Sequence, residues 1–277
     1  MIKRLFVKLY SFFIDKIVPV FGRVFVWRNK YCNVIYYHDV VDDCGGTCMY
    51  INVDKFKDQM KSLKEQGFEF LRFDDFSNKE NTRFKKKRVL VSFDDGWLSN
   101  YSKIFEFMRE NNIKYNIFLT VGKIGVDNDY LTWEMVRKMH SSGLVGFGAH
   151  TYSHPDMSDI DNINWEIEVE KANDVFQSEL GYSPVDFCYP FGYYSEESNK
   201  KLLEKTIYQR IYTSKSCYSQ LKEDKILFGR TGIQGEDGHN KFINIAYGYY
   251  NIKDFFIKVF YSPLLFVYHI VKHQSKQ

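Results

Sequence analysis

Two adjacent carboxylates end the apolar segment VLVSFDDGW, where Asp94 and Asp95 are followed directly by Gly96. Like charges in neighbouring positions raise each other's pKa and destabilise a fold, unless a cation or a separate partner for each carboxylate compensates. The segment therefore predicts one of two things at the end of a buried strand. It is either a turn that happens to be acidic, or a site for a divalent cation.

Two histidines four residues apart are the second candidate feature, in the segment HTYSH that contains His150 and His154. On a helical turn this spacing places both imidazoles on one side, within reach of one ion. Two neutral imidazoles and one carboxylate would leave positions open for water and substrate on Zn²⁺ or a similar ion. An H-x3-H pair alone is a weak signal, since two unrelated surface histidines also satisfy it.

Strand-like and helix-like patterns alternate along the chain from residue 33 onward, which predicts parallel β/α units in one continuous α/β domain. We expect strands at 33–40, 68–73, 88–93, 115–121, 144–150 and 185–190, and near 207–213 and 226–230. We expect helices at 53–67, 99–111, 132–143, 162–180 and 195–205. The predicted division of the chain is a basic amphipathic segment at 1–30, this domain at 31–240 and an aromatic amphipathic segment at 241–277.

Polar residues fall at the carboxyl ends of these predicted strands. His38, the Asp94–Asp95 pair, His150 and the Tyr189-Pro190 pair all occupy such positions. In barrel-like α/β folds that edge of the sheet carries the chemistry. Joined to the two other strand ends, the histidine pair becomes a strong indication of a metal site.

Three motifs at these positions resemble the polysaccharide deacetylases, also called NodB-homology domains, of carbohydrate esterase family 4. SFDDG at 92–96 matches the first motif of that family, and HTYSHP at 150–155 matches the second. YPFG at 189–192 is similar to the third, R-x-P-Y/F-G, with tyrosine in place of the arginine. The resemblance covers about 33–235, and YYHDV at 36–40 resembles a subset with an early Y-H-x-V strand.

The resemblance implies a distorted (β/α)7-type barrel and a metal-dependent N-deacetylase acting on an N-acetylated amino sugar. Its metal ligands would be Asp95, His150 and His154, with zinc expected first and cobalt, nickel or manganese as alternatives. Asp94 would be the general base that takes a proton from the attacking water. A backbone N–H at Tyr189 would stabilise the oxyanion, and Pro190 and Phe191 would contact the substrate.

The general acid is less well defined, because no match to the late L-x-H motif of the family exists in this sequence. His38, in the early strand, is favoured over His239, which follows the last expected strand in a Gly-rich segment. Arg230 is expected to orient Asp94 in place of the missing arginine of the third motif. Trp133 either forms a wall of a sugar site or packs in the core of an amphipathic helix, and the core is favoured.

The charge distribution suggests a membrane surface as a partner. Residues 1–30 carry a net charge of +6 and residues 253–277 a net charge of +3, in a chain whose total is +3. Basic ends favour phospholipid headgroups over nucleic acid. A helix over 3–24 would place six apolar side chains on one face, namely Phe6, Leu9, Phe13, Ile17, Val20 and Val24. The alternative is that both ends simply pack on the domain.

The terminal segments and the cysteines also indicate in which cellular compartment the protein is expected. No small-residue cleavage site follows the N-terminal apolar residues, and charges interrupt every stretch of the roughly 20 apolar residues that a bilayer span needs. Five cysteines are an odd number without a disulfide framework, and the close pair Cys44 and Cys48 reads as two loop thiols rather than a metal site. We therefore expect a cytoplasmic protein, associated with the inner face of the membrane.

Three alternatives to deacetylation of an amino sugar stay open. One is removal of an N-formyl group from a lipid-linked aminosugar, since the deacetylase would itself act on a lipid-linked or surface-glycan precursor. Another is a catalytically silent carbohydrate-binding domain, against which the complete set of carboxylates and histidines argues. The third is hydrolysis of an amide that is not part of a sugar.

Overall fold

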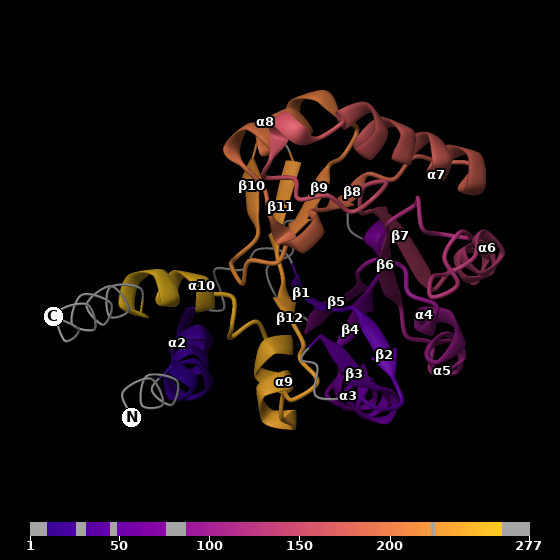
Figure 1. Ribbon diagram of the computed structural model, residues 1–277. Helices are drawn as coiled ribbons and strands as arrows, with labels where there is room; N and C mark the ends of the chain where they lie inside the picture. Colours follow the sequence, from indigo (N-terminus) through magenta and orange to yellow (C-terminus); the bar gives the residue numbers. More distant parts are fainter. Residues whose placement is uncertain (1–9, 26–31, 45–48, 76–86, 223–224, 262–277) are drawn as a thin grey trace, which may run out of the picture.

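The computed structural model describes residues 10–25, 32–44, 49–75, 87–222 and 225–261 (Figure 1). Its centre is a ten-stranded sheet in the order β10-β11-β9-β8-β7-β6-β5-β1-β12, with β4 paired to β5. The pairings are parallel except that between β10 and β11. Its strands are β1 (Asn33–Tyr37), β4 (Glu69–Leu71), β5 (Arg88–Phe93), β6 (Tyr115–Leu119), β7 (Val145–Ala149), β8 (Asp186–Cys188), β9 (Arg210–Thr213), β10 (Gln220–Lys222), β11 (Lys225–Gly229) and β12 (Thr231–Gly232). A separate small sheet pairs β2 (Asp39–Val41) with β3 (Tyr50–Asn52).

One residue joins the two ends of the large sheet. β11 pairs with β9 on one side of the sheet, β12 pairs with β1 on the other, and only Arg230 separates β11 from β12 in sequence. The sheet therefore curls until its ends approach each other, and it forms a nearly closed barrel. The predicted distorted barrel of β/α units is confirmed.

Helices follow most strands and cover the outside of the barrel (Figure 1). Those between β3 and β9 are α3 (Val53–Glu65), α4 (Ser99–Ser102), α5 (Phe105–Glu110), α6 (Trp133–Ser141), α7 (Ala172–Leu180) and α8 (Glu196–Lys205), with the shorter turns η3 (Phe73–Asp75), η4 (Ile160–Asn162), η5 (Glu166–Lys171) and η6 (Pro190–Gly192). Near the ends of the described chain lie η1 (Phe13–Ile17), α2 (Val18–Phe25), α9 (His239–Ala246), α10 (Lys253–Phe256) and η7 (Ile257–Tyr261).

Short polar side chains begin several of these helices. The Asn52 side chain accepts the N–H groups of Asp54 and Lys55 at the start of α3, and Thr132 accepts that of Met135 at the start of α6. Such caps satisfy backbone donors that the first helical turn leaves unpaired. The single helix expected over 99–111 is instead divided into α4 and α5. The boundary predicted between residues 240 and 241 falls inside α9.

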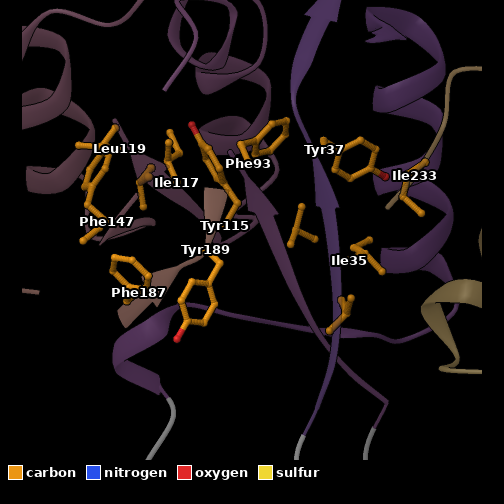
Figure 2. Packing of buried hydrophobic residues seen from close by; sticks show 14 of the residues in the cluster. Ile35, Tyr37, Phe93, Tyr115, Ile117, Leu119, Phe147, Phe187, Tyr189 and Ile233 are labelled. Atoms are coloured by element: carbon orange, nitrogen blue, oxygen red, sulfur yellow. The ribbon is translucent and has the colours of Figure 1, made fainter. Parts of the chain in front are cut away.

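Aromatic and β-branched side chains from the strands fill the layer beneath the helices (Figure 2). Tyr37 stacks on Phe93 with ring centroids 5.4 Å apart, and Phe93 meets Tyr115 edge to face at 5.8 Å. Aromatic pairs in these arrangements add to the free energy gained from burial alone. The core therefore fixes the carboxyl ends of β1, β5 and β6 relative to one another.

Asn116 completes the sheet where β5 changes its neighbour from β4 to β6. Its amide nitrogen donates to the carbonyl oxygens of Leu71 and Val91 at 2.9 and 3.2 Å, and its Oδ1 accepts the N–H of Phe73 at 2.7 Å. The side chain is fully buried. It thus supplies the hydrogen bonds that neither neighbouring strand can make at this point.

Replacing Asn116 by alanine should lower the free energy of unfolding by about 2–4 kcal/mol, because three buried backbone groups would lose their partner. Urea unfolding followed by circular dichroism measures this. Asn162→Ala is the matched control, since Asn162 is exposed and its amide bonds only Asp159. Equal stability of the two variants would contradict the role of Asn116.

No helix within the described residues is long and apolar enough to cross a membrane. Several predictions lie outside the described residues: the helical face contributed by residues 1–9, the segment 262–277, and Cys48.

Candidate active site

A cleft of about 290 Å³ opens at the carboxyl ends of the central strands. It is lined by Tyr36, His38, Met49, Asp94, Asp95, His150, His154, Phe191, Gly192, Tyr193, Ser214 and Arg230. Most of these residues follow β1, β5, β7, β8, β9 and β11, while Tyr36 lies within β1 and Met49 precedes β3. The cleft thus collects side chains that are up to 194 positions apart in the sequence, from Tyr36 to Arg230. The polar residues expected at the strand ends are therefore brought together.

The backbone turns the two adjacent carboxylates toward different partners. Asp95 has φ +75° and Gly96 has φ +88°, both in the left-handed region. A Cβ at Gly96 would also come within 2.9 Å of side-chain atoms of Leu119 and Ile124, so glycine suits this position on both grounds. The turn sends the Asp94 side chain inward and the Asp95 side chain toward the histidines.

Asp94 forms a two-pronged ion pair with Arg230. The guanidinium Nη1 donates to Oδ1 at 2.7 Å and Nη2 donates to Oδ2 at 2.9 Å, and both side chains are buried. Burial raises the pKa of the Asp94 carboxyl, but the charge and hydrogen bonds of Arg230 outweigh this and leave the pKa below its usual value. Asp94 is therefore ionised at neutral pH and fixed in orientation.

Asp95 and two histidines converge on one point. Asp95 Oδ1 lies 3.5 Å from His150 Nε2 and 3.2 Å from His154 Nε2, while Oδ2 accepts a hydrogen bond from the Trp97 indole at 3.0 Å. The ligand atoms of this trio all lie within 4.8 Å of one another. Asp95 Oδ1 is buried and makes no hydrogen bond by distance and angle. A buried carboxylate oxygen without a hydrogen bond, facing two ring nitrogens, fits a divalent cation.

His150 has the protonation state that a metal ligand requires. Its Nδ1 lies 2.8 Å from the carbonyl oxygen of Cys188, so the ring proton sits there and Nε2 faces Asp95. Burial lowers the pKa of His150 to about 4 against the opposing charges of both aspartates, so the ring is neutral at pH 7. A second group, Asp94, His150 and Cys188, also lies within ligand distance. It fits a cation poorly, because Arg230 occupies Asp94 and burial raises the pKa of the Cys188 thiol well above its usual value.

The segment from His150 to His154 is an irregular loop, not the helical turn that the spacing suggested. Thr151 and His154 have φ +65° and +70°, and the His154 N–H donates to Thr151 Oγ1 at 3.0 Å. Such positive φ values in residues other than glycine are uncommon and need support from their surroundings. The two imidazoles meet because the loop folds back on itself.

Glu168 provides that support, and nothing in the sequence marked it. Its carboxylate accepts the N–H of Ser153 at 2.8 Å, the Ser153 hydroxyl at 2.6 Å and the N–H of Tyr152 at 3.1 Å. It lies in the π-helical turn η5 and is buried. Turns of this kind occur frequently at functional sites. Glu168 therefore holds the loop that presents His154.

Glu168→Ala should weaken zinc binding by about 10- to 100-fold, which is the usual effect of removing a group that orients metal ligands. Competition with a chromophoric chelator measures the affinity. Glu166→Ala is the control, because Glu166 lies in the same turn but is exposed. An unchanged affinity in the Glu168 variant would show that the loop keeps its shape without this carboxylate.

His38 and His239 occupy different surroundings. His38 lines the cleft, its ring centroid is 5.6 Å from that of Tyr36, and its ring nitrogens have no hydrogen-bond partner in the described part of the chain. His239 is exposed at the start of α9 and does not line the cleft. The geometry therefore places His38, and not His239, where a proton could be exchanged with a molecule in the cleft.

Two of the predicted substrate contacts lie outside the cleft lining. Trp133 begins α6 with its ring edge-on to Phe176, at a centroid distance of 6.4 Å, and packs against the core. Pro190 is buried in η6. Phe191 does line the cleft, largely exposed, with its ring 4.5 Å from that of His154.

The backbone N–H of Tyr189 does not point into the cleft, contrary to expectation. It donates to the carbonyl oxygen of Tyr212 at 3.1 Å, continuing the pairing of β8 with β9. The N–H of Phe191, two residues later, has no acceptor among the described residues, and Phe191 has φ +56°. The sheet pairing thus extends one residue past the end of β8, and of these two N–H groups only that of Phe191 is left without an acceptor in the described part of the chain.

The position in this sequence that corresponds to the arginine of the third motif is residue 188, one residue before the tyrosine that was expected to replace it. One residue separates the arginine from the proline in R-x-P, so Cys188, not Tyr189, holds its position. Arg230 Nη2 lies 2.8 Å from Cys188 Sγ, and its guanidinium carbon lies 4.4 Å from the ring centre of Tyr36. The guanidinium of Arg230 thus reaches the space next to residue 188 from another strand end.

A nearly closed parallel barrel with an Asp-His-His cluster at its carboxyl edge defines the class of NodB-like deacetylase folds. The deacetylase PplD of Streptococcus pyogenes, solved in complex with acetate, superposes with a TM-score of 0.70 at 18% identity, over 78% of this chain and 98% of that one. BC0361, a polysaccharide deacetylase from Bacillus cereus, superposes with a TM-score of 0.67 at 21% identity, over 78% of this chain and 69% of that one. At these identities the likeness shows the fold.

Residues 81–210 match the polysaccharide deacetylase family. YxkH of Bacillus subtilis (strain 168), which its name assigns to the polysaccharide deacetylases, is 26% identical over 178 residues, covering 64% of this chain and 62% of that protein. The peptidoglycan-N-acetylglucosamine deacetylase of Bacillus cereus is 26% identical over 110 residues, covering 39% of this chain and 38% of the relative. The chain thus spans less than two thirds of the length of these relatives.

Proposed function

We propose that this protein is a metal-dependent N-deacetylase that hydrolyses the acetamide of an amino sugar. The observation that carries the proposal is Asp95 Oδ1, buried without a hydrogen bond between two histidine nitrogens and next to an ionised, oriented Asp94. The match of residues 81–210 to the polysaccharide deacetylase family supports the reaction type. The peptidoglycan-N-acetylglucosamine deacetylase of Bacillus cereus and the poly-beta-1,6-N-acetyl-D-glucosamine N-deacetylase of Staphylococcus aureus are both named for N-acetylglucosamine, which favours an N-acetylated hexosamine as the substrate.

Asp95, His150 and His154 would hold the ion, and zinc suits two imidazoles and a carboxylate. When bound, such an ion supplies Lewis-acid chemistry, polarising the amide carbonyl and making water more acidic. Asp94 accepts the proton of the attacking water, since Arg230 keeps its carboxylate ionised and aimed. The Phe191 N–H donates to the oxyanion that forms at the carbonyl.

His38 completes the reaction as the general acid. An amide nitrogen leaves only if it is protonated, so a donor must face the cleft from the side of the leaving amine. The unpartnered ring nitrogens of His38 meet this requirement, because the ring lines the same cleft as Asp94 and Asp95.

The substrate would be a lipid-linked sugar or a surface-glycan precursor, reached at the inner face of a membrane. The basic, apolar ends of the chain support this part of the proposal. Removal of an N-formyl group from the same kind of sugar uses the same residues and is the second candidate. Deformylation differs from deacetylation in the size of the acyl group that the cleft must hold.

Zinc-loaded protein should release acetate from an N-acetylhexosamine oligosaccharide, and Asp94→Asn should lower kcat by about 10²- to 10⁴-fold, because the amide cannot accept a proton. Enzymatic detection of acetate measures both. Formate release from an N-formyl substrate alone would replace the acyl assignment. Stoichiometric zinc without turnover on any acylated sugar would favour a carbohydrate-binding domain.

His38→Ala should lower kcat by about 10²-fold or more while leaving zinc affinity unchanged, because the ring donates a proton without holding the ion. His239→Ala is the matched control and should behave as the unmodified protein. Steady-state kinetics on the same oligosaccharide separates them. Full activity in the His38 variant together with a loss in the His239 variant would reverse the assignment of the acid.

A further inference from the structure

Two segments from opposite ends of the described chain pack together at one edge of the molecule (Figure 1). We call them the terminal pair: residues 10–25, which contain η1 and α2, and residues 253–261, which contain α10 and η7. Phe256 joins them, with its ring centroid 6.1 Å from that of Phe13 and 5.3 Å from that of Phe21. The two basic, apolar segments noted in the sequence are therefore one surface.

The N-terminal helix of the terminal pair carries two apolar stripes, one buried on the protein and one that packs at Phe13 but is exposed toward its C-terminal end. Ile14, Val18 and Gly22 are buried, and a Cβ at Gly22 would come within 1.7 Å of the Tyr249 carbonyl oxygen, so the helix is seated tightly. The second stripe, predicted from the sequence as the apolar face, points outward at its end, where Val20 and Val24 are 63% and 62% exposed. Packing on the domain thus leaves the end of this apolar face exposed to solvent.

The C-terminal member continues this face. Phe255 is 62% exposed and Val259 44% exposed, beside the buried Phe256. With Phe12, Val20, Phe21 and Val24, the terminal pair holds six of the twelve exposed large hydrophobic side chains of the described residues. Single exposed hydrophobic residues are ordinary on protein surfaces, but such a concentration on two short helices marks an interaction surface.

The charges around this face are basic because its acidic side chains are engaged by the protein. Asp15 lies 3.3 Å from Lys241 Nζ, and Asp254 accepts the N–H of Ser216 at 2.8 Å. Lys16, Arg23 and Lys258 are exposed on the same two segments. Basic side chains flanking an apolar face complement the phosphates and the acyl-chain boundary of an anionic bilayer.

We propose that the terminal pair is a membrane-docking surface that inserts Val20, Val24, Phe255 and their neighbours into the headgroup region of an anionic bilayer. The helices lie in the interface and do not cross it. The bilayer covers the outward apolar stripe, while the flanking lysines and arginine pair with lipid phosphates.

The terminal pair also connects directly to the cleft. Ser214 lines the cleft, and two residues later Ser216 bonds Asp254 of α10. The Tyr218 hydroxyl donates to the carbonyl oxygen of Phe25 at the end of α2. Docking would therefore hold the cleft next to the lipid surface, which suits an amino sugar carried on a lipid; this last step rests on the proposed deacetylase function.

Flotation with phosphatidylglycerol–phosphatidylcholine vesicles tests the surface. The full chain should float with these vesicles, and the variant Val20→Asp/Phe255→Asp should bind at least about tenfold more weakly, because two apolar side chains can no longer enter the interface. Val126→Asp is the matched control, since Val126 is 79% exposed on a loop away from the terminal pair. Lys16→Glu/Lys258→Glu should weaken binding and reduce its sensitivity to salt.

The controls separate this proposal from the proposed function. Activity on a soluble N-acetylated oligosaccharide should be unchanged in both double variants, which also shows that they fold, and Asp94→Asn should float like the unmodified protein. Absence of flotation, equal binding to pure phosphatidylcholine, or unchanged binding of the Val20→Asp/Phe255→Asp variant would overturn the proposal. Light scattering would also overturn the proposal if it showed a dimer that only the Val20→Asp/Phe255→Asp variant disrupts. A second copy of the chain, and not a bilayer, would then cover the terminal pair.

Discussion

The architecture of the site depends on removing the electrostatic repulsion between two carboxylates that are adjacent in sequence. Asp94 is neutralised from inside the barrel by Arg230, with both oxygens held at 2.7 and 2.9 Å. Asp95, turned away by its left-handed backbone, faces two imidazoles. Each carboxylate thereby has its own positive or cation-binding partner, and the repulsion that the sequence alone suggests is removed.

Arg230 links this electrostatic arrangement to the barrel. It is the one residue between β11 and β12, so the chain must bring the two ends of the sheet together to place it beneath Asp94. The guanidinium also lies over the ring of Tyr36, and the side chain is 1% exposed. A buried charge that loses its partner destabilises a protein by about 3–5 kcal/mol, so closure of the barrel and ionisation of Asp94 support each other.

Strong local signals made most of the fold predictable from the sequence. Apolar strands followed by polar ends, the Thr132 cap and the glycine at 67 with φ +77° each specify structure within a few residues. The cluster of Asp95, His150 and His154 was predictable for a related reason, because strand ends of parallel units meet at one edge of a sheet. The motif residues therefore gave the position of the cluster.

What the sequence did not predict depends on contacts between distant residues. The Tyr189 N–H is used by Tyr212, and only the register of β8 against β9 decides that. Glu168 supports the histidine loop from a turn 15 residues away from Ser153, with no spacing that would mark it. The outward stripe of α2 was visible as an apolar face, but which of two stripes packs is set by the fit of Gly22 against Tyr249.

Asp94 is assigned the role of general base and Asp95 that of metal ligand, and zinc titration of two isosteric variants distinguishes the two roles. Calorimetry on Asp94→Asn and Asp95→Asn, each compared with the unmodified chain, reports the affinity that each carboxylate contributes. We expect near-normal zinc affinity in Asp94→Asn and a loss of at least about 100-fold in Asp95→Asn, since only Asp95 would ligate the ion. Equal losses in both variants, or a larger loss in Asp94→Asn, would contradict these separate roles of the two carboxylates.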